Sequence, residues 1–210
     1  MTWDRDLFWQ ANHLSATTGW AHGFMAAYAL WGGLVAIVAV WAAAWFTARR
    51  RADGYAALAV VVLAGVGSVL ALGLNQIIGP AVDRARPFAA MPHVLLLLPH
   101  SADSSFPSDH CMIAGALAGG LLLASIRWGA LATALALFLA FARVYVGVHY
   151  PTDVLAGLLL GAAVTLLTVL ALRAALVRLL AVLATTPLRA LVTAAPSAPG
   201  PGRADATVRR

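Results

Sequence analysis

Lysine and glutamate are absent from the 210 residues, and cysteine occurs once, at Cys111. A single cysteine excludes an intramolecular disulfide and any multi-cysteine metal site. Charged residues make up only 10% of the chain and hydrophobic residues 62%, which lies far outside the range of a soluble globular domain. Water is therefore not the main solvent of this chain.

Several apolar stretches reach the roughly 20 residues that a helix needs to cross a bilayer. Five spans are predicted, over residues 20–47, 55–79, 110–126, 129–147 and 153–172. The stretch 176–194 is also apolar, but Arg178, Pro187 and Arg189 interrupt it, so it is either a surface helix or a marginal sixth span. The sequence thus predicts an all-α, polytopic transmembrane bundle of about five to six spans.

The two ends of the chain differ from this core. Trp3, Leu7, Phe8, Ala11 and Leu14 recur at helical spacing. This pattern predicts a short amphipathic helix over 3–14, lying at the membrane interface. Residues 195–210 are rich in Ala, Pro, Gly and Arg, and we predict a disordered cytoplasmic tail. Residues 1–194 then form a single membrane-embedded domain.

The arginines predict the orientation of the chain. One side of the predicted bundle receives Arg49, Arg50, Arg51, Arg127, Arg173, Arg178 and Arg189. The positive-inside rule makes this side cytoplasmic, so the loop 79–109 and the turn 147–153 face the extracytoplasmic side. Because most arginines flank apolar segments, they fit orientation signals and anionic lipid headgroups, and we expect no nucleic-acid partner.

Three polar clusters lie at span ends on that outer side. The first, Asp83-Arg84-Ala85-Arg86-Pro87, follows the second span. A guanidinium group donates two parallel hydrogen bonds that match the oxygens of a phosphate. The alternative is a solvated loop with arginines at the interface.

The second cluster, Phe106-Pro107-Ser108-Asp109-His110, precedes the third span. Ser108 or Asp109 is a plausible N-cap, and the free N–H groups of a helix start attract anions. His110 at the same end is suited to give a proton to a leaving oxygen. A helix cap followed by an interfacial histidine is the alternative.

The third cluster runs from Arg143, inside the fourth span, to Asp153 at the start of the fifth. An arginine within an apolar helix needs an anionic partner. His149 precedes Asp153 by four residues, so the two can form a hydrogen-bonded pair. Such a pair fixes the imidazole tautomer and stabilises the cation that forms when the other ring nitrogen attacks.

Together the clusters resemble the type-2 phosphatidic-acid-phosphatase superfamily, whose motifs are K-x6-R-P, P-S-G-H and S-R-x5-H-x3-D. The matching residues are Arg86-Pro87, then Pro107-Ser108-Asp109-His110, then Arg143 with His149 and Asp153. The resemblance covers about residues 75–160. It implies that His149 is a nucleophile forming a phosphohistidine, that Asp153 orients it and that His110 is the general acid. Arg86, Arg143 and Ser108 would bind phosphoryl oxygens, and no metal or other cofactor is implied.

The chain departs from the family pattern at three positions. Gly79 stands where the first motif has lysine, and Arg84 is the candidate to compensate. Ala142 stands where the family often has serine. Asp109 replaces the glycine of the second motif, so a carboxylate joins the phosphate site and must be turned aside, protonated or paired with an arginine.

The Pro-Ser-Asp-His form, together with Asn12-His13-Leu14 and residues 147–153, is most similar to bacterial undecaprenyl-diphosphate phosphatases. This implies hydrolysis of a polyprenyl diphosphate to the monophosphate, at the outer face of the bacterial inner membrane, to recycle the cell-wall carrier lipid. The partners are then a lipid phosphate and the bilayer, and no obligate protein partner is evident.

Three alternatives stay open. In the first alternative the substrate is phosphatidic acid, phosphatidylglycerophosphate or another prenyl phosphate, because the lipid tail meets only generic apolar helix faces and the sequence does not separate these substrates. The chain is a non-catalytic binder or transporter of a lipid phosphate, which the missing lysine favours. The third alternative, an intramembrane haem or metal protein using His110 and His149, is disfavoured because paired histidines do not face each other inside two spans.

Overall fold

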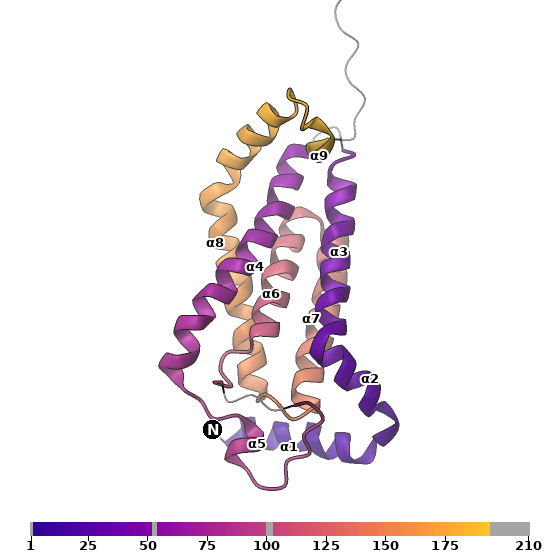
Figure 1. Ribbon diagram of the computed structural model, residues 1–210, viewed down its shortest axis with the longest axis vertical. Helices are drawn as coiled ribbons and strands as arrows, with labels where there is room; N and C mark the ends of the chain where they lie inside the picture. The colour runs from indigo at the N-terminus through magenta and orange to yellow at the C-terminus, as the bar shows by residue number, and fades with distance from the viewer. Residues whose placement is uncertain (1, 52–53, 100–102, 194–210) are drawn as a thin grey trace, which may run out of the picture.

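The computed structural model describes residues 2–51, 54–99 and 103–193, and all regular elements in these ranges are helices (Figure 1). Four segments are long and apolar enough to cross a membrane: Gly19–Ala48, Gly54–Ala90, Ile126–Tyr145 and Pro151–Leu183. The predicted all-α membrane fold is confirmed. The chain is a multi-pass membrane protein.

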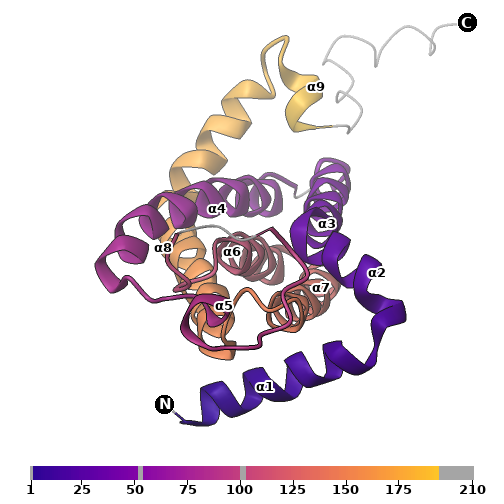
Figure 2. The same ribbon diagram turned by 60° about the horizontal axis from the view of Figure 1, so that its bottom comes forward.

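Helix α6 (Asp109–Ala124) occupies the centre of the bundle, and α3, α4, α7 and α8 surround it (Figure 2). The surrounding helices are α3 (Gly33–Ala48), α4 (Gly54–Val82), α7 (Ile126–Tyr145) and α8 (Pro151–Leu183). A Cβ on Gly115 would lie 2.1 Å from the carbonyl oxygen of Leu158, so only glycine lets α6 and α8 pack this closely. Small residues at a helix interface allow such close packing in membrane proteins.

With 16 residues, α6 is shorter than each of the four segments that are long enough to cross a membrane. It rises about 24 Å, less than the hydrocarbon core of about 30 Å. The predicted count of five to six spans therefore stays a prediction.

The first span is not a uniform α-helix. A 3-10 turn (Gly19–Ala21) leads into α2 (His22–Ala27), and a π-helical turn (Tyr28–Gly32) separates α2 from α3. Such π-turns interrupt the regular hydrogen-bond ladder of a helix and are frequent at functional sites.

Helix α1 (Thr2–Thr17) lies across one end of the bundle, opposite α9 (Arg189–Val192) (Figure 1). Trp3, Leu7 and Leu14 are exposed, as an interfacial amphipathic helix requires. Phe8, predicted on the same face, is buried instead. The buried side of α1 consists of Asp4, Phe8, Asn12 and Ser15, so it is largely polar.

The prediction of a separate segment over 176–194 was wrong. Helix α8 continues through 33 residues to Leu183, so it reaches about 50 Å. The reason lies in the sequence, because no glycine or proline follows Gly161 until Pro187. The predicted tail, 195–210, lies outside the described residues, and the single domain over 1–194 stays a prediction.

Candidate active site

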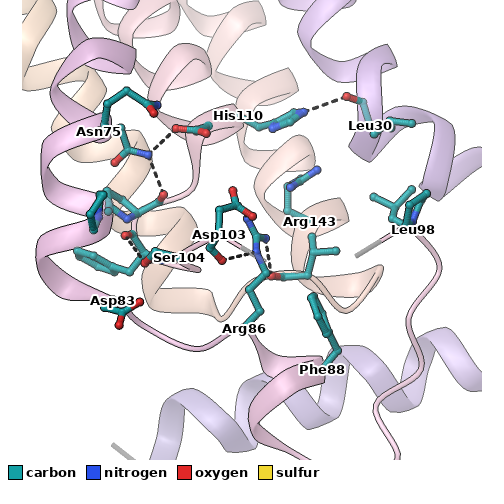
Figure 3. Close-up of a pocket in the computed structure, with 18 residues that line it drawn as sticks. Leu30, Asn75, Asp83, Arg86, Phe88, Leu98, Asp103, Ser104, His110 and Arg143 are labelled. Atoms are coloured by element: carbon teal, nitrogen blue, oxygen red, sulfur yellow. Dashed lines mark hydrogen bonds and ion pairs between the residues drawn. The ribbon is translucent and has the colours of Figure 1, made fainter. Parts of the chain in front are cut away.

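A cavity of about 520 Å³ opens at the α1 end of the bundle (Figure 3). Arg86, Arg143 and His110 line it together with four polar residues, Asn75, Asp83, Asp103 and Asp109. These residues come from the end of α4, the segment 83–108, the start of α6 and the last turn of α7. All three predicted clusters therefore meet at one place.

The segment between α7 and α8 places His149 next to this cavity, in contact with the lining residues Arg86 and Arg143. It turns at Gly147, whose φ of +88° lies in the left-handed region, and a Cβ there would lie 2.5 Å from the carbonyl oxygen of Leu95. Asp153, in the first turn of α8, accepts a hydrogen bond from the backbone nitrogen of Tyr150 at 2.9 Å. The turn and this cap fix the path of the backbone on both sides of His149.

The imidazole of His149 is 1% exposed. Its Nδ1 lies 2.8 Å from the carbonyl oxygen of Ser105 and 3.8 Å from Oδ2 of Asp153. A carbonyl oxygen only accepts, so Nδ1 carries the proton and Nε2 keeps its lone pair. The hydrogen-bond partner of Nδ1 is thus the backbone of Ser105. The direct hydrogen bond predicted between His149 and Asp153 is not formed, because 3.8 Å separates Nδ1 from Oδ2.

Two guanidinium groups face the lone pair of Nε2. Nη2 of Arg143 lies 3.1 Å from it and Nη1 of Arg86 lies 3.3 Å from it. Burial lowers the pKa of His149 to about 4, although a contribution from Asp153 raises it, and the cations of Arg143 and Arg86 lower it further. At neutral pH the imidazole is therefore uncharged and can act as a nucleophile.

Both arginines are more than nine-tenths buried, at 8% exposure for Arg86 and 7% for Arg143. Arg86 donates to the carbonyl oxygen of Val148 at 3.1 Å and pairs with Asp103 at 3.1 Å. Arg143 donates to the carbonyl oxygen of Ala29, in the π-turn, at 3.1 Å. Among the residues that the structure describes, no carboxylate lies within ion-pair distance of Arg143.

His110 and Ser108 lie at the start of α6. Nε2 of His110 lies 2.9 Å from the carbonyl oxygen of Leu30, again in the π-turn, so this nitrogen is the donor (Figure 3). Ser108 is fully buried, and its hydroxyl has no hydrogen-bond partner in the described part of the chain. The Nε of Arg143 is likewise buried without a partner there. Both groups can therefore donate a hydrogen bond that no described residue accepts.

The added carboxylate of Asp109 lines the cavity and is hydrogen-bonded to Asn75. Its Oδ1 accepts a hydrogen bond from Nδ2 of Asn75, in α4, at 2.5 Å (Figure 3). Gly79, in place of the family lysine, lines the same wall of the cavity, and a Cβ there would meet only ordinary contacts at 3.8 Å or more.

Arg84 does not reach this cavity, so the interpretation of Arg84 as a phosphate ligand does not fit the structure. Its guanidinium pairs with Asp4 at 2.6 Å and with Asp153 at 2.5 Å. These two carboxylates hold it behind His149, on the side away from Arg86 and Arg143. Sequence reasoning missed Asp4, because nothing in a local pattern indicates a contact with a residue 80 positions away.

A profile of the PAP2 superfamily matches residues 56–176, more than half of the chain. The chain belongs to the PAP2 superfamily, as its motifs predicted. It is similar to the undecaprenyl-diphosphatase of Sulfolobus acidocaldarius, with 38% identity over 105 residues, which are 50% of this chain and 51% of that protein. Identity to undecaprenyl-diphosphatase BcrC of Bacillus subtilis is 33% over 135 residues, 64% of this chain and 65% of the relative.

The matches thus span about half to two thirds of the curated relatives. Among solved structures, the crystal structure of Aquifex aeolicus LpxE aligns with a TM-score of 0.58 and 22% identity, covering 78% of this chain and 93% of that chain. This likeness supports the fold.

Proposed function

We propose that the protein is a membrane phosphatase that hydrolyses a polyprenyl diphosphate, such as undecaprenyl diphosphate, to the monophosphate and inorganic phosphate. The observation that carries this proposal is the uncharged Nε2 of His149, 3.1 Å and 3.3 Å from two buried guanidiniums. Two of the relatives are undecaprenyl-diphosphatases, which supports this choice of substrate.

In the first step Nε2 of His149 attacks the terminal phosphorus, and the bond from this phosphorus to the bridging oxygen breaks. Arg86 and Arg143 then bind the phosphoryl oxygens and stabilise the charge that spreads over them in the transition state. The Nδ1–H bond to Ser105 holds the imidazole as it becomes positively charged. The negatively charged diphosphate favours the imidazolium form of His110, whose Nε2 stays bound to Leu30. Its Nδ1 then protonates the bridging oxygen, and the polyprenyl monophosphate leaves.

In the second step water attacks the phosphohistidine. His110, now a base, takes a proton from this water, the N–P bond breaks, and phosphate and the neutral His149 are restored. Ser108 is suited to donate to a phosphoryl oxygen, because its buried hydroxyl has no partner among the described residues. An anionic phosphate would also neutralise the charge of Arg143, which forms no ion pair with a carboxylate among the described residues.

For the location we propose the bacterial inner membrane, with His149 on the extracytoplasmic side. The positions of the arginines support this orientation. Seven arginines lie at the end of the bundle opposite α1 (Figure 1). Three follow α3, one begins α7, and three lie in or after the second half of α8: Arg49, Arg50, Arg51, Arg127, Arg173, Arg178 and Arg189. The positive-inside rule makes this end cytoplasmic.

We expect purified protein to release phosphate from polyprenyl diphosphate in excess chelator, because two guanidiniums replace the charge that a metal would supply. Added magnesium should not raise the rate. In sealed right-side-out vesicles, a short-chain prenyl diphosphate added outside should be hydrolysed, whereas inverted vesicles should hydrolyse it only after permeabilisation. The same phosphate-release assay with phosphatidic acid and phosphatidylglycerophosphate compares their rates with that of polyprenyl diphosphate.

Release that stops in chelator would contradict the metal-free mechanism, and hydrolysis by intact inverted vesicles would contradict the orientation. Tight binding of the diphosphate without any phosphate release would instead favour the alternative of a non-catalytic lipid-phosphate binder.

The pH dependence of kcat/KM should reflect the low pKa of His149. Only the neutral imidazole attacks, so activity is present above the folded-state pKa and is lost as the pH falls through it. Because burial lowers this pKa from 6.5 to about 4, we expect the acidic midpoint of kcat/KM near pH 4. A midpoint near 6.5 would show that a different or an exposed histidine controls the reaction.

A further inference from the structure

Asp4 is 2% exposed, although it belongs to α1, the helix at the membrane interface. Its carboxylate accepts hydrogen bonds from the backbone nitrogen and the hydroxyl of Thr152, at 3.0 Å and 2.8 Å, and from Nη2 of Arg84 at 2.6 Å. Burial raises the pKa of Asp4, but the bonds from Arg84 and Thr152 outweigh it and lower the pKa below its usual value. A buried, ionised carboxylate is costly unless it is fully paired, and here it is.

Arg84 joins this carboxylate to a second one. Its Nη1 lies 2.5 Å from Oδ1 of Asp153 and 2.7 Å from the hydroxyl of Thr152. The guanidinium also stacks on the ring of Tyr150, 3.9 Å from the ring centroid. Phe8 of α1 packs against Tyr150 in turn, with 5.7 Å between the ring centroids. Helix α1 therefore supplies both a charge partner and an aromatic support for Arg84.

From Asp153 the contacts continue to His149. Oδ2 of Asp153 accepts a hydrogen bond from the hydroxyl of Ser105 at 2.5 Å. The carbonyl oxygen of the same Ser105 accepts the bond from Nδ1 of His149 at 2.8 Å. A continuous path of hydrogen bonds and ion pairs thus runs from the interfacial helix to the candidate nucleophile.

We propose that Asp4 and Arg84 are positioning residues, which fix Asp153 and, through it and Ser105, the imidazole of His149. This inference rests on the proposed function and extends it to α1. Neither residue contacts the substrate. Their removal leaves the phosphate site intact but loosens the nucleophile, so the chemical step slows while substrate binding is kept.

Asp4→Asn should lower kcat about ten- to hundredfold with little change in KM, because a misplacement of about 1 Å can cost about a hundredfold in rate. The variant keeps the size of the side chain and removes its charge, so Arg84 loses one of its two anchors. The matched control is Asp6→Asn, which removes the same charge from an exposed position of α1 and should leave both constants unchanged.

Arg84→Gln should reproduce this loss of kcat, again without a rise in KM. If Arg84 bound phosphate, KM would rise instead, and the inference would be overturned. Because both residues act through Asp153, the double variant Asp4→Asn/Arg84→Gln should be no slower than Arg84→Gln alone. Multiplied losses in the double variant would show that the two residues act independently.

Arg84→Lys covers the case in which the other variants do not fold. It keeps the positive charge between the two carboxylates, but a single ammonium cannot replace the fork that spans them. We expect a folded protein with a lowered kcat and the KM of the wild type, and a wild-type kcat would overturn the inference. If the wild type releases no phosphate, the proposed function fails. Wild-type kinetics of Asp4→Asn would overturn only the role of α1.

Discussion

Replacement of His149 by alanine should abolish phosphate release, with kcat lowered by about 10⁴-fold or more. The variant loses the nitrogen that forms the covalent bond, so the first step of the proposed mechanism has no nucleophile. The two guanidiniums remain, so the lipid should still bind. The expected result is an inactive protein with nearly unchanged affinity for the diphosphate.

A trapping experiment separates this role from general damage to the site. Substrate labelled at the terminal phosphate is mixed with protein in chelator and quenched in alkali, in which a phosphohistidine survives. The wild type should carry the label and lose it in acid, whereas His149→Ala should carry none. The control is His13→Ala, an exposed histidine of α1, which should label like the wild type. Label or turnover in His149→Ala would remove His149 from the nucleophilic role.

The apolar lengths in the sequence predicted the fold because the bilayer sets the length of its helices. The same rule misplaced the end of α8. Counting apolar residues stops at the thickness of a bilayer, near residue 172, whereas the helix runs to Leu183 because nothing before Pro187 breaks it. Helix ends outside the membrane are therefore set by local backbone chemistry.

The site residues that could be predicted are those at span ends on one side of the membrane. This geometry brings Arg86 and Arg143 within hydrogen-bond distance of His149, although Arg86 is 63 positions from it in the sequence. The sequence could not predict which way each side chain points. Arg84 and Arg86 are only two residues apart, yet Arg86 faces the cavity and Arg84 the opposite side, because Asp4 and Asp153 hold it there.

The sequence also could not predict which backbone carbonyl groups accept hydrogen bonds from the site residues. The carbonyl groups of Ala29, Leu30 and Ser105 hold Arg143, His110 and His149, respectively. Every residue has a carbonyl group, so residue types carry no signal for this role. A π-turn within an apolar span, which brings Ala29 and Leu30 to the site, has no local sequence pattern that we could use.

Arg143→Lys should lower kcat by about 10²- to 10³-fold, the loss typical of removing one preorganised donor to transition-state charge. The guanidinium bonds the π-turn through Nη1 and faces Nε2 of His149 through Nη2, while its buried Nε has no partner in the described part of the chain. A single ammonium group cannot reach all of these positions. Lysine therefore keeps the positive charge but loses the planar set of donors that a guanidinium provides.

Arg143→Gln tests the charge as well as the shape. It should be slower than Arg143→Lys, yet it should fold, because an uncharged amide costs less to bury than an unpaired cation. Arg173→Gln, at an exposed position of α8, is the matched control and should keep the kcat of the wild type. Single-turnover rates at saturating substrate measure the chemical step directly. If Arg143→Lys forms the phosphoenzyme as fast as the wild type, Arg143 supports the bundle and the transition-state charge is stabilised by Arg86 alone.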